Sequence, residues 1–146
     1  MFLRDLATAD SLPALEASVR FAAQRQQVLA HNIANIETPD FRPLDLPVGE
    51  FQAALRDAVD RRDRDFGGHR GALQVRETAN LRVNSRGELE VRAAQPSRNI
   101  LFHDRNNRDT ERLMQDLAEN AGAYRASVDL LRSRYDVLRT AISGRL

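Results

Sequence analysis

Apolar side chains recur with alternating spacings of three and four residues along the early part of the chain. This spacing places them on one side of an α-helix, and only Gln26 interrupts it. The row consists of Leu12, Leu15, Val19, Ala22, Leu29, Ile33 and Ile36. Ser11 is a favourable N-cap and Pro13 suits the first helical turn. The pattern therefore predicts one long helix within residues 1–36.

A second and more regular apolar row lies near the other end of the chain. Its spacing alternates between three and four without a miss through Met114, Leu117, Ala121, Tyr124, Val128, Leu131, Tyr135, Leu138 and Ile142. Acidic residues gather at the start of this segment and arginines toward its end, which matches the macrodipole of a helix within residues 109–146. We expect the two rows to pack together as a coiled-coil seam. On the first helix the seam comprises Leu15, Val19, Leu29 and Ile33.

The first helix should end abruptly at a corner rich in proline. Thr38 precedes Pro39, and the residue before a proline is pushed out of the α region. Asn35 tolerates the left-handed conformation that closes many helices. Two further prolines prevent the helix from restarting, Pro43 and Pro47. An extended arm is the expected continuation.

The rest of the segment 37–108 reads as an insertion between the two helices. Helical spacing predicts a short amphipathic helix over residues 49–60, and the mixed charges of residues 56–65 indicate a solvated face or a mobile linker. Alternating apolar residues predict a β-hairpin over residues 81–91, which needs a helix or a neighbouring chain to lean on. The predicted fold is mainly α: an antiparallel coiled coil of long N- and C-terminal helices carrying an extended loop, a short helix and a small β-hairpin, together one domain.

Candidate chemistry adds little to this picture. The 146 residues include no cysteine, which excludes disulfides and thiol chemistry. The histidines His31, His69 and His103 are far apart and lack metal-ligand spacing, and no nucleophile elbow or phosphate-binding glycine loop is present. We therefore expect no catalytic residue, no metal and no cofactor.

The charge pattern also argues against nucleic acid and membranes. The formal net charge is only +1, and Asp129 and Asp136 interrupt the arginines of the second helix. No apolar window is long enough for a transmembrane helix, and the first residues lack the apolar core of a cleaved signal peptide. A structural or adaptor role is left as the expectation.

Two stretches of the chain resemble one known family. The corner carries an Asn-Ile-Ala-Asn helix end followed by Thr-Pro-Asp-Phe. It is similar to the N-terminal signature of the flagellar rod and hook axial proteins, in which Asn-Ile-Ala-Asn leads into Thr-Pro-Gly-Tyr. The run 117–121, with Tyr124 and the run 138–142, is similar to the short proximal-rod members of that family. The matching residues of the corner are Asn32, Ile33, Ala34, Asn35, Thr38, Pro39, Asp40 and Phe41.

Three residues depart from the family pattern. Asp40 stands where the family has glycine, Phe41 replaces tyrosine, and His31 replaces a small or amide residue. Aspartate fits a type I turn more easily than a turn that requires positive φ. We therefore expect Pro39 and Asp40 to form a type I turn.

The resemblance implies a non-enzymatic subunit of the bacterial flagellar basal body. Such a subunit is exported without a cleaved leader by the flagellar type III export apparatus and polymerises in the periplasmic rod, where it transmits torque and forms the wall of the export channel. Implied partners are other rod subunits, which its arm would reach, the rod adaptor protein FliE and the membrane ring, with no nucleic acid or small-molecule substrate. The alternatives are another short rod subunit of the family, or a soluble coiled-coil adaptor or chaperone.

Overall fold

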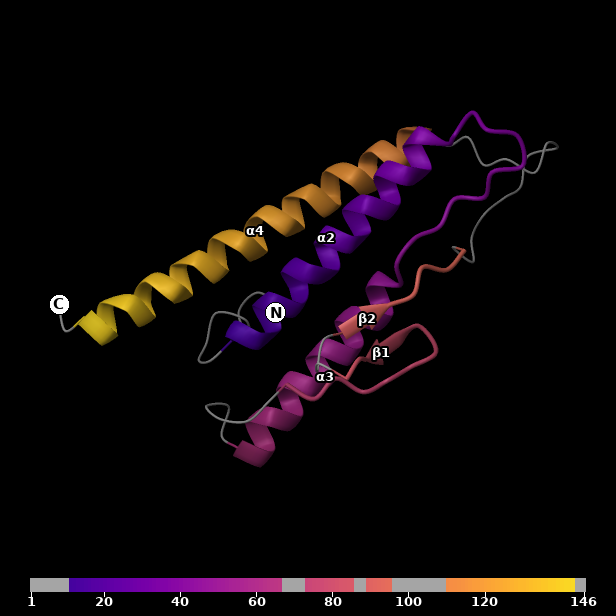
Figure 1. The fold of residues 1–146 in the computed structure, drawn as a ribbon. Helices are drawn as coiled ribbons and strands as arrows, with labels where there is room; N and C mark the ends of the chain where they lie inside the picture. The colour runs from indigo at the N-terminus through magenta and orange to yellow at the C-terminus, as the bar shows by residue number, and fades with distance from the viewer. Residues whose placement is uncertain (1–10, 67–72, 86–88, 96–109, 144–146) are drawn as a thin grey trace.

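The structure is a computed structural model that describes residues 11–66, 73–85, 89–95 and 110–143. Its elements are α2 (Leu12–Ala34), α3 (Val48–Phe66), β1 (Leu81–Val83), β2 (Leu89–Val91) and α4 (Thr110–Ser143), shown in Figure 1. The described chain is mainly helical with a small two-stranded antiparallel sheet, as predicted. Expectations for His69, His103 and both ends of the range 109–146 lie outside the described residues.

The long helix α2 begins and ends where the sequence indicates, but the interactions at its two ends differ from those that the sequence predicts. Ser11 occupies the N-cap position without a capping bond from its side chain, and its carbonyl accepts from the Leu15 N–H at 2.9 Å. At the other end Asn35 has a φ of −110°, so the expected left-handed closure is wrong. The Asn35 Nδ2 instead donates to the carbonyl of His31 at 2.8 Å, and the same carbonyl accepts from the Asn35 N–H at 3.2 Å.

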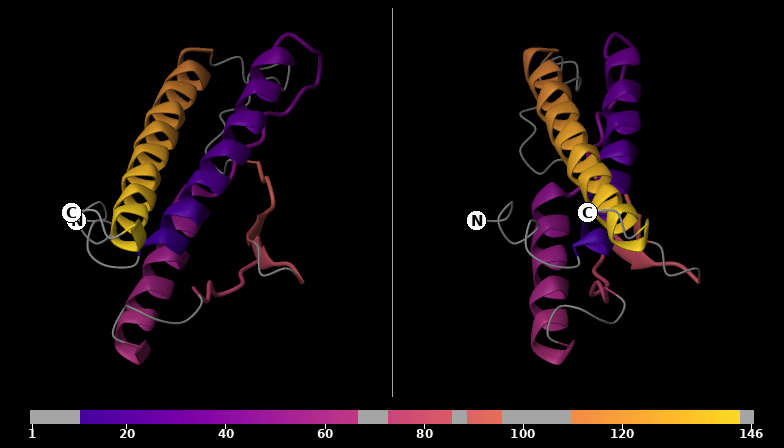
Figure 2. Two further views of the ribbon diagram at one scale, coloured as in Figure 1. Left: turned by 60° about the vertical axis from the view of Figure 1, so that its left-hand side comes forward. Right: turned by 90° about the vertical axis from the view of Figure 1, so that its left-hand side faces the viewer.

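The helix α2 lies between two sets of neighbours (Figures 1 and 2). On one side α4 runs antiparallel to it, since Asn120 meets the middle of α2 and Tyr135 meets Glu16 near its start. On the other side lie α3 and the hairpin. With 34 residues against 23, α4 runs past the start of α2.

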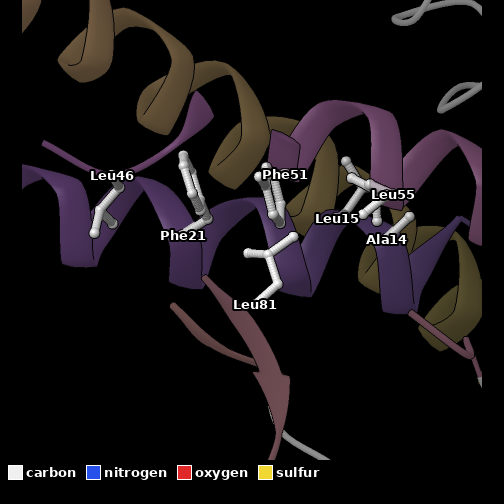
Figure 3. Close-up of a cluster of buried hydrophobic side chains, with 8 residues drawn as sticks. Ala14, Leu15, Phe21, Leu46, Phe51, Leu55 and Leu81 are labelled. Atoms are coloured by element: carbon white, nitrogen blue, oxygen red, sulfur yellow. The ribbon is translucent and has the colours of Figure 1, made fainter. Parts of the chain in front are cut away.

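The buried core lies on the α3 side of α2, as Figure 3 shows. The rings of Phe21 and Phe51 stack with centroids 4.0 Å apart and planes 8° from parallel. The cluster comprises Ala14, Leu15 and Phe21 of α2, Leu46 of the arm, Phe51, Ala54 and Leu55 of α3, and Leu81 of β1. Coiled-coil packing between the two long helices is therefore not confirmed. The insertion contributes the larger share of this core.

The helix α3 is longer than predicted, because residues 61–66 are also helical. The linker interpretation is thus wrong for these residues, and the solvated-face interpretation holds for the charged run. Buried Phe51, Leu55 and Ala58 occupy one side of α3. Most of the charged side chains are exposed, and Arg61 pairs with Asp57 one turn away at 3.2 Å.

The hairpin pairs β1 with β2 in the register Leu81 to Val91 and Val83 to Leu89. It leans on α2 and α3, because Leu81 is fully buried in the core. Next to it, Asn80 Nδ2 donates to Glu50 of α3 at 2.9 Å, and this hydrogen bond lowers the pKa of the Glu50 carboxyl. The expected small hairpin supported by a helix is confirmed.

One isolated bridge connects the arm to the chain that follows the hairpin. The Asp45 N–H donates to the Ala94 carbonyl and the Ala94 N–H donates to the Asp45 carbonyl, each at 3.0 Å. These two bonds close the segment between residues 45 and 94 at its base. Asp45 thereby becomes the point at which the insertion is attached to the long helices.

Candidate assembly site

The arm returns along its own helix and is held there by Asn32. The Leu44 N–H donates to Asn32 Oδ1 at 3.1 Å, and Asn32 Nδ2 donates to the Leu44 carbonyl. The amide side chain therefore pairs with the backbone as a neighbouring strand would. Asn32 is only 1% exposed, so both of its polar groups need these partners. The motif residue Asn32 sets the path of the arm.

One buried cation holds the next residue of the arm. Arg25 of α2 donates from Nε and Nη2 to the two carboxylate oxygens of Asp45, both at 2.9 Å. This hydrogen-bonded pair raises the pKa of the Arg25 guanidinium, despite the opposing effect of burial. The Arg25 Nη2 also lies 3.7 Å from Asp116 of α4, whose pKa is raised by burial. Arg25 thus contacts the arm and α4 at once.

The corner contains a β-turn over residues 38–41. The Phe41 N–H donates to the Thr38 carbonyl at 3.2 Å, and Asp40 at the third position has a φ of +58°. Positive φ at this position is the mark of a type II turn, so the predicted type I turn is wrong. Asp40 stands where the similar family motif has glycine, and its positive φ is a conformation that glycine adopts readily. Aspartate tolerates this conformation better than most residues.

Replacing Asp40 with glycine should stabilise the chain. Glycine removes the strain of positive φ, and this gain should exceed the extra entropy of the unfolded chain, leaving about 0.5 kcal/mol in the free energy of unfolding. Valine at the same position should instead lower that free energy by more than about 1 kcal/mol. Urea unfolding of the two variants beside the unmodified chain checks this order. A destabilising Asp40→Gly would indicate the type I turn instead.

The other two departures from the family motif contact each other. The rings of His31 and Phe41 meet edge to face, with centroids 5.7 Å apart and planes at 66°. Asn35 Nδ2 lies 3.3 Å from His31 Nδ1 on the same surface. Phe41 is half-buried and His31 is exposed, so the pair covers the outer side of the corner. The aromatic residue of the motif therefore anchors the turn to the end of α2.

The contact between α2 and α4 has a polar centre. Asn120 of α4 is buried, and its Nδ2 donates to the Ala22 carbonyl and to Gln26 Oε1, both at 2.9 Å. Gln26 is the residue that interrupts the apolar row of α2. A buried amide pair of this kind fixes the register of two helices, because sliding would leave it unpaired. Farther along, the Tyr135 hydroxyl donates to Glu16 at 2.8 Å, and this raises the pKa of Tyr135.

The predicted seam is only partly buried. Leu15 and Leu29 are buried, although Leu15 belongs to the core shared with α3. The half-buried members are Val19, Ile33, Leu117, Val128 and Leu131. The exposed members, all on α4, are Met114, Tyr124, Tyr135 and Leu138. At about 100° per residue, Tyr124, Tyr135 and Leu138 lie on the same side of α4 as buried Leu113 and Asn120, so they are partly exposed at the edge of the contact with α2. The backbone of Ile142 is helical, and its side chain is not among those described.

We name these four exposed side chains the α4 stripe and define it as Met114, Tyr124, Tyr135 and Leu138. Met114 is 47% exposed and Tyr135 is 45% exposed. Large apolar side chains exposed in a row along a helix mark an interaction site more often than scattered ones do. The motif turn and the α4 stripe are the two candidate assembly features of this part of the chain.

The residues that sequence reasoning missed are the polar ones that fix the geometry. The spacing of residues along the chain does not predict the contact between Arg25 and Asp45. The two residues lie on either side of the corner, and the sequence does not show in which direction the chain leaves it. Asn120 lay within the similar C-terminal run but was not singled out. Of these polar residues, only Gln26 stood out in the sequence, because it interrupts an otherwise apolar row.

Other kinds of site find no support in the described part of the chain. Residues 11–66, 73–85, 89–95 and 110–143 contain no group of three or more His, Asp or Glu side chains that could hold a metal ion. Among the same residues, no helix has the length and apolar character needed to cross a membrane. No protein-family model matches the chain, and a search of curated proteins finds no relative.

Proposed function

We propose that this chain is a structural subunit of the bacterial flagellar rod, of the proximal-rod kind represented by FlgB. The observation that carries the proposal is the α4 stripe, which leaves Met114, Tyr124 and Tyr135 exposed along one long helix. Full burial of a large apolar side chain is worth about 1.5–3 kcal/mol, so covering the exposed parts of these side chains would favour association. Copies of the chain, or closely related subunits, are the partners that would cover it.

The motif turn supports the choice of family. In the similar family signature, glycine follows the proline of the turn, and in this chain the same position adopts positive φ. The buried amide of Asn32 likewise has a definite task in holding the arm. These residues serve geometry, which suits a building element better than an enzyme. In the rod, the long helices would pack as coiled coils between subunits.

Motility in the bacterium that carries the chain tests this proposal. With the gene deleted, a plasmid copy should restore swimming, and the tagged chain should co-purify with basal bodies. Tyr124→Asp places a charge in the α4 stripe at an exposed position and should abolish swimming while leaving the fold intact. The matched control is Ala126→Asp, which lies on the exposed opposite flank of α4 and should swim normally.

Two results would contradict the proposal. Normal swimming after deletion would exclude a rod subunit. Binding of the chain to one soluble protein, with none recovered in basal bodies, would favour the adaptor or chaperone alternative instead.

A further inference from the structure

The two outer edges of the hairpin differ in how far their backbone groups are paired. On β1, the outward N–H of Leu81 donates to Thr78 Oγ1 at 3.1 Å, and the Leu81 carbonyl accepts from the Thr78 N–H at 2.8 Å. The outward N–H of Val83 donates to Glu77 Oε1 at 3.0 Å. The residues just before β1 thus occupy the groups that a further strand would need. The edge of β1 is closed to another strand.

The outer edge of β2 is open. The Arg92 N–H donates to the Asn80 carbonyl on the β1 side at 2.8 Å, so the alternate residues Leu89, Val91 and Ala93 direct their backbone groups outward. Within the described residues, no hydrogen bond to these outward N–H and C=O groups is found. The hairpin lies on the side of α2 away from α4 (Figure 2). The edge of β2 therefore presents a row of free donors and acceptors.

The side chains along β2 alternate between an apolar and a charged face. Leu89 and Val91 are half-buried and pack against the core, whereas Glu90 and Arg92 are exposed. Glu90 Oε1 accepts from Asn84 at 3.3 Å, which leaves Glu90 Oε2 without a hydrogen bond among the described residues. The exposed face of β2 thus carries one carboxylate and one guanidinium, two residues apart, for contacts outside the hairpin.

This pattern is complementary to itself in the antiparallel direction. If two copies of β2 meet edge to edge with Val91 opposite Val91, the outward backbone groups of both strands face each other in hydrogen-bonding pairs. Leu89 then lies opposite Ala93 on the apolar face, and Glu90 lies opposite Arg92 on the exposed face. Moving the axis by one residue would instead place Glu90 opposite Glu90, or Arg92 opposite Arg92, and like charges in this position repel. The charges therefore select one register.

We propose that two copies of the free chain associate through their β2 edges into one continuous antiparallel sheet, with Val91 on the two-fold axis. Strand addition of this kind gains main-chain hydrogen bonds and covers an edge that would otherwise be open to other chains. The contact closes at two copies, because each copy contributes the same surface. The inference goes beyond the proposed function, since a closed pair concerns the chain before it joins an assembly.

Charge reversal in the purified full chain tests this pairing, with sedimentation equilibrium from micromolar to low-millimolar concentration as the measurement. The unmodified chain should show a monomer–dimer equilibrium. Glu90→Arg and Arg92→Glu should each weaken dimerisation roughly tenfold or more, because each variant places like charges opposite each other on both sides of the axis. An equimolar mixture of the two variants should dimerise again, since one copy then carries only arginines and the other only carboxylates at the facing positions.

The matched control is Arg82→Glu, which reverses a charge on the same exposed face of the hairpin but on the closed strand β1. Arg82 stands opposite Glu90 in the hairpin register, so this change disturbs the hairpin comparably, yet it should leave the dimer unchanged. Tyr124→Asp should also leave the dimer unchanged, which separates this contact from association through the α4 stripe. Circular dichroism of every variant checks that the fold is kept.

Three results would overturn the inference: a monomer at every concentration, equal weakening of the dimer by Arg82→Glu, or single variants that stay monomeric when mixed. The result is independent of the motility test. A chain that enters basal bodies but is monomeric when free would leave the rod proposal standing and remove this contact. A dimer restored in the mixture, from a chain that is absent from basal bodies, would do the reverse.

Discussion

Replacing Asp45 with alanine is expected to lower the free energy of unfolding by about 3 kcal/mol, which is the lower end of the range for breaking a buried ion pair. The change leaves the Arg25 guanidinium buried without its two charge-assisted hydrogen bonds. It also removes the Asp45 Oδ1 that accepts from the Leu46 N–H at 2.7 Å. The Asp45 side chain is 22% exposed, which keeps the loss from being larger. The midpoint of urea unfolding measures the change.

The matched control for this variant is Asp116→Ala. Its carboxylate lies 3.7 Å from the same Arg25 nitrogen, and burial raises its pKa, so its charged form gains little from the fold. A loss below about 1 kcal/mol is expected. Equal losses in the free energy of unfolding would show that the pair of Arg25 with Asp45 stabilises the fold no more than the contact of Arg25 with Asp116. A negligible loss for Asp45→Ala would refute the role assigned to Arg25.

Phe51→Ala should be still more damaging, with a loss of about 3–5 kcal/mol. The ring is 4% exposed and stacks on Phe21, so its removal leaves a cavity between α2 and α3 that the neighbouring rigid helices cannot fill. Thermal unfolding followed by circular dichroism should show a much lower midpoint. Because α3 is held mainly by this core, its hydrogen-exchange protection should fall together with the midpoint.

Truncation of a second phenylalanine to alanine, at the corner, provides a comparison for this loss of stability. Phe41 is half-buried and touches His31 by its edge, so Phe41→Ala should cost only about 1 kcal/mol. Comparable losses at the two positions would mean that the core described between α2 and α3 does not carry the stability of the chain.

Periodicity predicts the elements of this chain well because it depends on neighbours along the helix. The rows from Leu12 and from Met114 both lie on helices, and the alternation around Leu81 and Leu89 lies in the hairpin. The same rows do not predict which partner covers them. Leu15 belongs to a cluster shared with α3 and the hairpin, against which Leu130 and Leu131 of α4 also pack, because the insertion returns along α2 and takes up much of its apolar side.

The sequence did not predict the direction in which the chain leaves α2 at the corner, and this direction decides which segments come into contact. It depends on the φ of Asp40, on the amide of Asn32 and on the pairing of Arg25 with Asp45, and none of these follows from spacing. The family resemblance singled out Asn32 and Asp40, but the expectation that aspartate avoids positive φ gave the wrong turn type. Polar contacts between distant segments appear only once the path of the backbone is known.

The bridge between Asp45 and Ala94 has a consequence for how such chains can vary. Since the two residues bond to each other in both directions, everything between them forms a loop with joined ends. Adding or removing residues in those parts of the loop that lie outside the core costs little closure entropy and need not displace α2 or α4. The outer parts of the insertion can therefore change size while the helical pair and the core on α2 keep their arrangement.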